Sequence, residues 1–206
     1  MSTILLTGYE PFGEYETNPS AAIAQSFDGV VTGDTTIVGR TLPVVFDDAL
    51  PRARSLIEEH QPSAILSTGL MPEREVLTME RVGINVRDYD NVPDNADQTP
   101  VDEPVRPDGP VAYFATVPIK ELVAAAREAG TPARVSNTAG THLCNNILYA
   151  TRHHIVSNEL DILSGFVHVP YSHSQAARQR ETVPSMSINA MESGVAAMLR
   201  TLNANF

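Results

Sequence analysis

Short apolar runs alternate along the chain with segments in which apolar residues recur at helical spacing. Runs of four to eight apolar or β-branched residues are typical of buried strands, and apolar residues three or four positions apart are typical of one helix face. The runs predict strands at residues 2–7, 35–42, 63–68, 133–136 and 161–168, and a strand pair or bent strand at 76–86. The helical spacings predict helices at residues 21–27, 47–60, 118–129, 143–156 and 185–202.

This alternation continues from one end of the chain to the other, without an internal repeat or a linker-like segment. It predicts a single α/β domain over residues 1–206, with a mostly parallel central sheet and helices on both faces. Asn18 followed by Pro19 marks the start of the first helix, and Asp47 or Asp48 is expected to cap the second.

Sites in open α/β sheets form beyond the carboxyl ends of strands. Three loops meet this condition, at residues 8–18, 69–75 and 137–144, and His168 joins them if its strand is parallel to the others. Residues 91–110 are different, because five prolines and five acidic residues leave little apolar content there. We expect this segment to be a long surface loop that acts as a lid or a binding segment.

The amino-acid composition and net charge exclude several classes of protein and partner. The 206 residues are 42% hydrophobic and include one cysteine, which excludes a disordered tail and a disulfide-stapled scaffold. The net charge is −11 and Lys120 is the single lysine, so a nucleic-acid partner is not expected. No stretch approaches a membrane span and the first residues lack a basic start, so we expect no membrane association and a cytoplasmic location. The acidic excess suggests adaptation to a salt-rich cytoplasm, with an ordinary acidic enzyme as the alternative.

The lone Cys144 follows a glycine-containing turn and opens a predicted helix. The helix dipole and free backbone N–H groups at such a position lower a thiol pKa, and the same groups suit an oxyanion. A buried, inert cysteine is the alternative.

A base for this thiol is expected at His168, at the end of an apolar strand, where a hydrogen-bonded core histidine is the alternative. His142 and His173 are rivals. Glu80 lies in a β-rich segment and either orients the imidazole or pairs with Arg81; Asp161 is a weaker candidate. No set of His and Cys residues has metal-ligand spacing, so no metal site is expected.

The first loop, TGYEPFG, has the glycine spacing of a phosphate loop but places Glu14 and Tyr15 where lysine and a hydroxyl residue belong. An apolar pocket walled by Tyr9 and Phe12 fits this loop better.

Five blocks in sequence order resemble the pyroglutamyl peptidases, a family of cysteine peptidases. They are TGYEPFG with Asn18-Pro19, ERVGIN, VPDN at 92–95, SNTAGTHLCN and GFVHVPY. The resemblance covers nearly the whole chain. It implies a three-layer α/β/α fold, a homotetramer, no cofactor, and removal of N-terminal 5-oxoproline from a peptide. It also implies that Cys144 is the nucleophile, His168 the base and Glu80 the orienting acid, with a thioester intermediate.

The same resemblance implies a substrate pocket and shows where this chain departs from the family. The pocket positions fall on Tyr9, Phe12, Leu70, Val92, His142 and Leu143. His142 and Tyr9 replace more usual aromatic residues, and Leu70 follows Gly69 where some members carry an amide, which favours lactam recognition by backbone groups. Asn91 stands where an oxyanion-stabilising arginine is frequent, and Arg87 is a possible substitute.

Two other functions are compatible with the sequence. His142 and Asn91 motivate a thiol hydrolase of another cyclic or acyl amide. A non-catalytic binder of pyroglutamyl peptides would keep the pocket and lose the activity.

Overall fold

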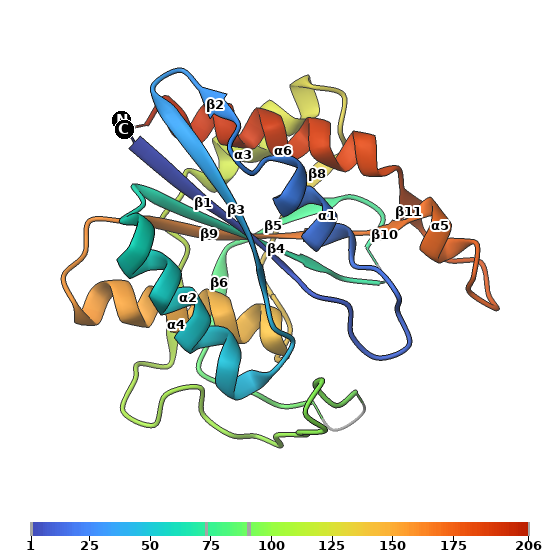
Figure 1. The fold of residues 1–206 in the computed structure, drawn as a ribbon. Helices are drawn as coiled ribbons and strands as arrows, with labels where there is room; N and C mark the ends of the chain where they lie inside the picture. Colours follow the sequence, from blue (N-terminus) through green and yellow to red (C-terminus); the bar gives the residue numbers. More distant parts are fainter. Residues whose placement is uncertain (1, 73, 90–91, 206) are drawn as a thin grey trace.

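A seven-stranded sheet forms the centre of the molecule in a computed structural model that describes residues 2–72, 74–89 and 92–205 (Figure 1). Its strand order is β2-β3-β1-β4-β9-β5-β8. The strands are β1 (Ser2–Tyr9), β2 (Val31–Thr32), β3 (Thr35–Leu42), β4 (Ala64–Leu70), β5 (Leu77–Glu80), β8 (Ala133–Ser136) and β9 (Leu163–Val169).

The central strands β3, β1, β4 and β9 run parallel to one another. β5 is antiparallel to β9 and parallel to β8, and the short β2 is antiparallel to β3. The prediction of a mostly parallel sheet is therefore confirmed. The reversal at β5 brings its carboxyl end beside the middle of β9 rather than to the carboxyl edge of the parallel strands.

Helices cover both faces of this sheet, which confirms the predicted three-layer α/β/α arrangement (Figure 1). One layer contains α1 (Pro19–Ser26), α3 (Ile119–Glu128) and α6 (Ile188–Asn203), and the other contains α2 (Phe46–His60) and α4 (Leu143–Ser157). Each layer closes its own apolar core. Met79, Val167 and Met198 belong to the first core, and Leu56, Ile147 and Phe166 belong to the second. Alternate residues of β9 therefore face opposite layers, as strand geometry requires.

Short elements outside the seven-stranded sheet include β6 (Val82–Ile84), within the predicted segment 76–86, and β7 (Ala112–Phe114), β10 (Tyr171–Ser172), β11 (Ser185–Met186) and α5 (His173–Ala176), which were not predicted from the sequence. β6 pairs with β7, and β10 pairs with β11 next to the short α5. The predicted helix at 185–202 therefore begins later, at Ile188, where the Ser187 hydroxyl accepts a hydrogen bond from the Ala190 amide. The segment 76–86 contains two strands, β5 and β6, but they lie in different sheets and do not form the predicted pair.

The start of α2 differs from the prediction. The helix begins at Phe46, and neither Asp47 nor Asp48 caps it, because Val45 occupies the cap position without a side-chain bond. The carboxylate of the distant Asp94 accepts a hydrogen bond from the Phe46 amide instead, at 2.8 Å. The described part of the loop from 92 to 110 contains no helix or extended strand, as expected, and it is anchored to α2 at this point.

A crevice opens where β1 and β4 separate. Their pairing ends at Thr7 and Ser67, after which β1 continues along β3 and β4 continues along β9. Chain order reverses at this point of the sheet, which is where open α/β sheets bind ligands. Among the described residues, no helix is long and apolar enough to cross a bilayer.

Candidate active site

Glu80 and His168 form a buried pair on neighbouring strands. Thr78 of β5 lies opposite His168 of β9, so Glu80 is its diagonal neighbour on the same sheet face. His168 Nδ1 lies 2.8 Å from Glu80 Oε1, and both side chains are essentially inaccessible to solvent. His168 Nε2 is buried without a hydrogen-bond partner among the described residues. The imidazole is thus fixed at one nitrogen and free at the other.

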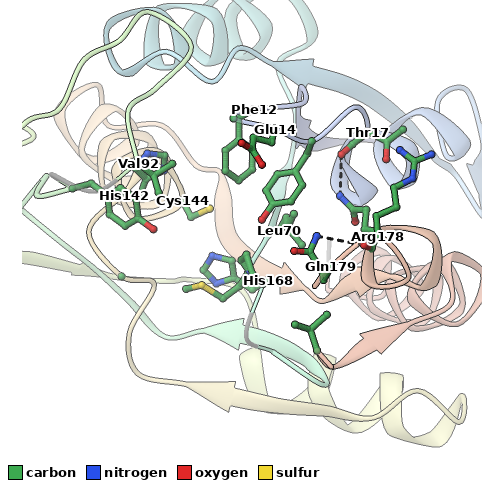
Figure 2. Close-up of a pocket in the computed structure, with 18 of the residues that line it drawn as sticks. Phe12, Glu14, Thr17, Leu70, Val92, His142, Cys144, His168, Arg178 and Gln179 are labelled. Atoms are coloured by element: carbon green, nitrogen blue, oxygen red, sulfur yellow. Dashed lines mark hydrogen bonds between the residues drawn. The ribbon is translucent and has the colours of Figure 1, made fainter. Parts of the chain in front are cut away.

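Cys144 is the second residue of α4, whose first turn packs over this sheet face. Figure 2 shows the Cys144 sulfur and the His168 imidazole pointing toward one another at one side of a cleft. The first turn of α4 has no side-chain cap from His142, which leaves its amide groups available to a ligand. The structure therefore brings together the thiol, imidazole and carboxylate that the sequence suggested as candidates.

Gly69, near the end of β4, makes room for the sulfur. A Cβ atom at this position would lie 2.7 Å from Cys144 Sγ and 2.8 Å from a ring carbon of Phe166. Contacts that short are not tolerated between well-packed groups. A glycine is therefore required here by the close approach of α4 to the strand.

The expected lowering of the Cys144 pKa is wrong for the resting site. Burial raises the pKa of this thiol to about 12, and the negative charge of Glu80 adds to the effect, while the backbone N–H of Cys144 opposes it. Desolvation thus outweighs the helix terminus. Cys144 carries its proton until a neighbouring group accepts it.

The cleft has a volume of about 770 Å³ and is lined from segments distant in sequence. Cys144 and His168 lie in it with Leu70 and Val92 on the same side, and Thr17, Arg178 and Gln179 lie on the other (Figure 2). A smaller cavity of about 30 Å³ adjoins it beside Cys144. The lining residues of this cavity are Tyr9, Phe12, Asn18, Val44, Leu70, His142, Leu143 and Cys144.

Most of the predicted pocket residues line the smaller cavity, and Val92 lines the cleft. The sequence did not point to Val44 or Asn18, since Asn18 was recognised only as a helix cap. Burial raises the pKa of the Tyr9 phenol, with a further contribution from Cys144, so its hydroxyl remains a donor. It donates to the Leu143 carbonyl at 2.9 Å and thereby fastens the first turn of α4 to β1.

His142 acts as an uncharged ring in this wall. Its ring centroid lies 4.3 Å from that of Tyr89 and 5.1 Å from that of Phe46. Burial lowers the His142 pKa to about 4, against opposing contributions from the Val92 backbone and the Asp94 charge. The ring is therefore neutral near pH 7, and its buried Nε2 has no hydrogen-bond partner among the described residues.

The backbone of Leu70 offers a paired donor and acceptor to the crevice. The Met71 amide donates to the Val169 carbonyl of β9, so the amide and carbonyl of Leu70 point to the opposite side of β4. On that side β1 has already separated, because the pairing of the two strands ends at Ser67. These two backbone groups match a ligand that presents an adjacent N–H and C=O.

Other predicted residues lie elsewhere. The Arg87 guanidinium pairs with Glu103 at 3.0 Å and with Asp47 at 3.4 Å, and Arg87 is not among the described residues that line the cleft. Asn91 lies outside the described residues.

Of the rival residues, His142 lines the cavity beside Cys144, whereas neither Asp161 nor His173 is among the described residues that line the cavity or the cleft. Arg81 donates to Asn137 rather than pairing with Glu80, and Asp161 precedes β9. His173 is exposed and its Nδ1 lies 2.9 Å from the Ser185 hydroxyl oxygen. Among residues 2–72, 74–89 and 92–205, no group of three or more His, Cys, Asp or Glu side chains is arranged to hold a metal ion.

Comparison with protein families gives a match over residues 2–204 to a family described as pyroglutamyl peptidase. A pyrrolidone-carboxylate peptidase of Escherichia fergusonii is 44% identical over 191 residues, which cover 93% of this chain and 88% of that protein. One from Pseudomonas fluorescens is 43% identical over 202 residues, covering 98% and 92%.

Solved structures give the same result. The crystal structure of a mutant pyrrolidone carboxyl peptidase from P. furiosus superimposes with a TM-score of 0.96 at 36% sequence identity. The match covers 99% of this chain and 99% of that one. Sequence and fold therefore agree over almost the whole length.

Proposed function

Because this chain belongs to the pyroglutamyl peptidase family, a family of peptidases, we propose that it removes N-terminal 5-oxoproline from peptides by means of Cys144, His168 and Glu80. The observation that carries the proposal is the buried imidazole of His168. Nδ1 is held by Glu80, and Nε2, which has no hydrogen-bond partner in the part of the chain that the structure describes, lies on the side of the chain's single thiol. This arrangement suits a nucleophile, a base and an orienting acid.

The raised pKa of Cys144 sets the order of events. The thiol proton moves to His168 Nε2 as the sulfur attacks the pyroglutamyl carbonyl carbon, because a free thiolate is disfavoured in the resting site. The tetrahedral intermediate then collapses, the C–N bond breaks, and the imidazolium gives its proton to the leaving amine. Water attacks the resulting thioester with His168 as base. The sulfur leaves with a proton and 5-oxoproline is released.

The acyl pocket in this proposal consists of Tyr9, Phe12, Leu70, Val92, His142 and Leu143. The 5-oxoproline ring is a neutral lactam, so an apolar wall with a few hydrogen-bonding groups suits it. We propose that the Leu70 amide donates a hydrogen bond to the lactam C=O and that the Leu70 carbonyl accepts one from the lactam N–H. The small cavity has room for about two waters. The cavity alone is smaller than a five-membered ring and shares Phe12, Leu70, His142 and Cys144 with the cleft, so a bound ring either extends into the cleft or displaces a wall.

The first turn of α4 would stabilise the oxyanion. Its uncapped amide groups, including that of Cys144, are directed toward the helix N-terminus, where the dipole favours negative charge. Arg87 is left out of this role because its guanidinium is engaged by Asp47 and Glu103. The possible role of Asn91 remains a prediction from the sequence.

Release of the chromophore from a pyroglutamyl-anilide tests this proposal. We expect the purified protein to cleave this substrate and not the matching prolyl-anilide, and we expect iodoacetamide or Cys144→Ser to abolish cleavage. Binding of 5-oxoproline without turnover would instead support a non-catalytic binder. Cleavage of other acyl anilides with the pyroglutamyl compound left intact would support the second hydrolase function.

That second function, a thiol hydrolase of a different cyclic amide, is favoured by one feature of the wall. The buried Nε2 of His142 has no partner among the described residues, and a ligand with a further polar group could supply one.

A homotetramer and a cytoplasmic location are also part of the proposal, on the basis of the family resemblance. Light scattering on the purified protein tests the tetramer, with a mass near one chain as the contrary result. Fractionation of the source cells tests the location.

A further inference from the structure

Three segments that carry walls of the acyl pocket are joined by a closed ring of hydrogen bonds. Glu10 Oε1 accepts from the Val44 amide at 3.0 Å and from Asn95 Nδ2 at 2.9 Å. The Val44 carbonyl accepts from the Asn95 amide at 2.8 Å. We call Glu10, Val44 and Asn95 the clamp. Each member contacts the other two, although 34 and 85 residues separate Glu10 from Val44 and Asn95.

Each member of the clamp is close in sequence to a pocket wall. Phe12 lies two residues after Glu10, Val44 itself lines the small cavity, and Val92 lies three residues before Asn95. Asn95 Nδ2 also donates to the Pro11 carbonyl at 3.0 Å, immediately before Phe12. The distance between these walls is therefore set by the clamp.

The segments behind the clamp are themselves fixed. Asp94 is buried, and its carboxylate accepts from the amides of Phe46, Ala96 and Gln98 at 2.8–2.9 Å. The Glu10 carbonyl accepts from Asn18 Nδ2 at 3.0 Å. The Asp94–Phe46 bond joins the same two segments as the Asn95–Val44 bond, so Asp94 and the clamp together restrain the walls at Val44 and Val92.

We propose that Glu10 and Asn95 are positioning residues that limit how far the acyl pocket opens, and so restrict it to a five-membered lactam. This inference rests on the proposed function. The small cavity alone is smaller than a lactam ring, and the hydrogen bonds of the clamp limit how far its walls can separate to admit one. Neither side chain lines the cleft or the cavity, so neither is expected to touch the substrate.

The test begins with Asn95→Asp, which replaces the donor by a carboxylate next to Glu10 and the Pro11 carbonyl. We expect KM for the pyroglutamyl-anilide to rise about tenfold, with a smaller change in kcat. The preference for the five-membered lactam over the six-membered homologue should fall by a similar factor. The rate of Cys144 alkylation by iodoacetamide should not change, because the reacting groups are untouched.

Two further variants separate positioning from general damage. In Glu10→Gln with Asn95→Asp, the repulsion between the two carboxylates is removed, because the new amide can donate to the new carboxylate while its oxygen still accepts from Val44. The new carboxylate still faces the Pro11 carbonyl, so KM and ring preference should recover in part. Asn85→Asp is the matched control, since Asn85 Nδ2 also bridges two loop carbonyls, those of Arg106 and Gly109, away from the cleft. In Asn85→Asp, KM and the preference for the five-membered lactam should equal those of the unmodified protein.

Hydrogen exchange of the Val44 amide gives a readout that needs no turnover. Its protection should fall in Asn95→Asp and return in the double variant. An unchanged KM and ring preference in Asn95→Asp would overturn the inference, as would a loss of Cys144 reactivity of equal size. If the unmodified protein releases no chromophore, the proposed function fails. The positioning role of Glu10 and Asn95 is tested independently by hydrogen exchange, and unchanged protection of the Val44 amide in Asn95→Asp would reject it.

Discussion

In the proposed mechanism, the half-buried Cys144 and the buried His168 share one proton. Burial keeps Cys144 protonated, with a pKa raised to about 12, and Glu80 contributes to that increase through its charge. The same carboxylate lies 2.8 Å from His168 Nδ1, where in the proposed mechanism it would stabilise the imidazolium formed when the thiol loses its proton. Glu80 is hydrogen-bonded to the imidazole and acts on the thiol through its charge alone, so we expect its effect on the imidazole to be the larger one.

Glu80→Gln should therefore impair the reaction despite relieving the thiol of a neighbouring negative charge. The amide still accepts from Nδ1 but does not stabilise an imidazolium, so we expect kcat to fall by about 100-fold or more, by analogy with serine triads. Steady-state kinetics on the pyroglutamyl-anilide measures this. Glu128→Gln, at an exposed position of α3, is the control. Equal kcat values in the two variants would remove Glu80 from the mechanism.

His142 should make the stability of the fold depend on pH. Its pKa is lowered to about 4 in the folded chain, against about 6.5 when unfolded, so the unfolded chain binds more protons between these values. Stability is therefore lost as the pH falls through this window, by about 2 kcal/mol at pH 4.5. Urea unfolding of the unmodified protein and His142→Phe at pH 7 and 4.5 measures the difference. Identical pH slopes for the two proteins would contradict this expectation.

At the scale of elements, the sequence predicted the long strands and helices because their periodicity is local. The sequence also indicated His168 and Cys144 as candidate catalytic residues, since His168 lies near the end of a predicted strand and Cys144 at the start of a predicted helix. The short β7, β10 and β11 were missed because pairing across the fold, and not their own pattern, makes them strands. The cap of α2 comes from Asp94, 48 residues away, which no local signal reveals. The reversal of β5 and the clamp are likewise consequences of tertiary pairing.

The approach of α4 to β4 leads to a prediction at Gly69. In Gly69→Ala, the new methyl group would lie 2.7 Å from Cys144 Sγ, so the thiol must shift and kcat/KM should fall at least about tenfold. The rate of Cys144 alkylation should change with it. Gly165→Ala is the matched control, because its methyl group would crowd Val117 and Met79 in the opposite core. It should lose stability by about 1–3 kcal/mol while its folded fraction keeps its activity. Equal kcat/KM values would show that the sulfur tolerates the methyl group.

For the whole molecule, charge is the dominant feature. The net charge is −11, so the excess negative side chains repel one another in the folded state. The ion pairs Arg178–Glu16 and Arg40–Asp28 have exposed partners and offset little of this repulsion. Raising the ionic strength from 0.1 M to 1 M shortens the screening length from about 10 Å to about 3 Å. Salt weakens both the repulsion and the ion pairs. We expect the stability gained from reduced repulsion to exceed the stability lost from the weakened pairs.

A series of KCl concentrations tests this expectation. If about 2 kcal/mol of repulsion is screened, the melting temperature should rise by about 4–8 °C between 0.1 and 3 M KCl. A parallel series in an uncharged osmolyte such as sucrose separates screening from general exclusion effects. A melting temperature that is insensitive to KCl would argue for an ordinary acidic enzyme instead of one adapted to salt.

The single sulfhydryl at the cleft has a practical consequence for preparing and counting the enzyme. Cys144 is the only cysteine, so a thiol-directed covalent label has no competing site. If Cys144 is the nucleophile, as proposed, the moles of label incorporated equal the moles of competent centres. A preparation oxidised in storage would show a proportional deficit in label and in turnover. The fold itself would remain intact, because no cystine holds it together.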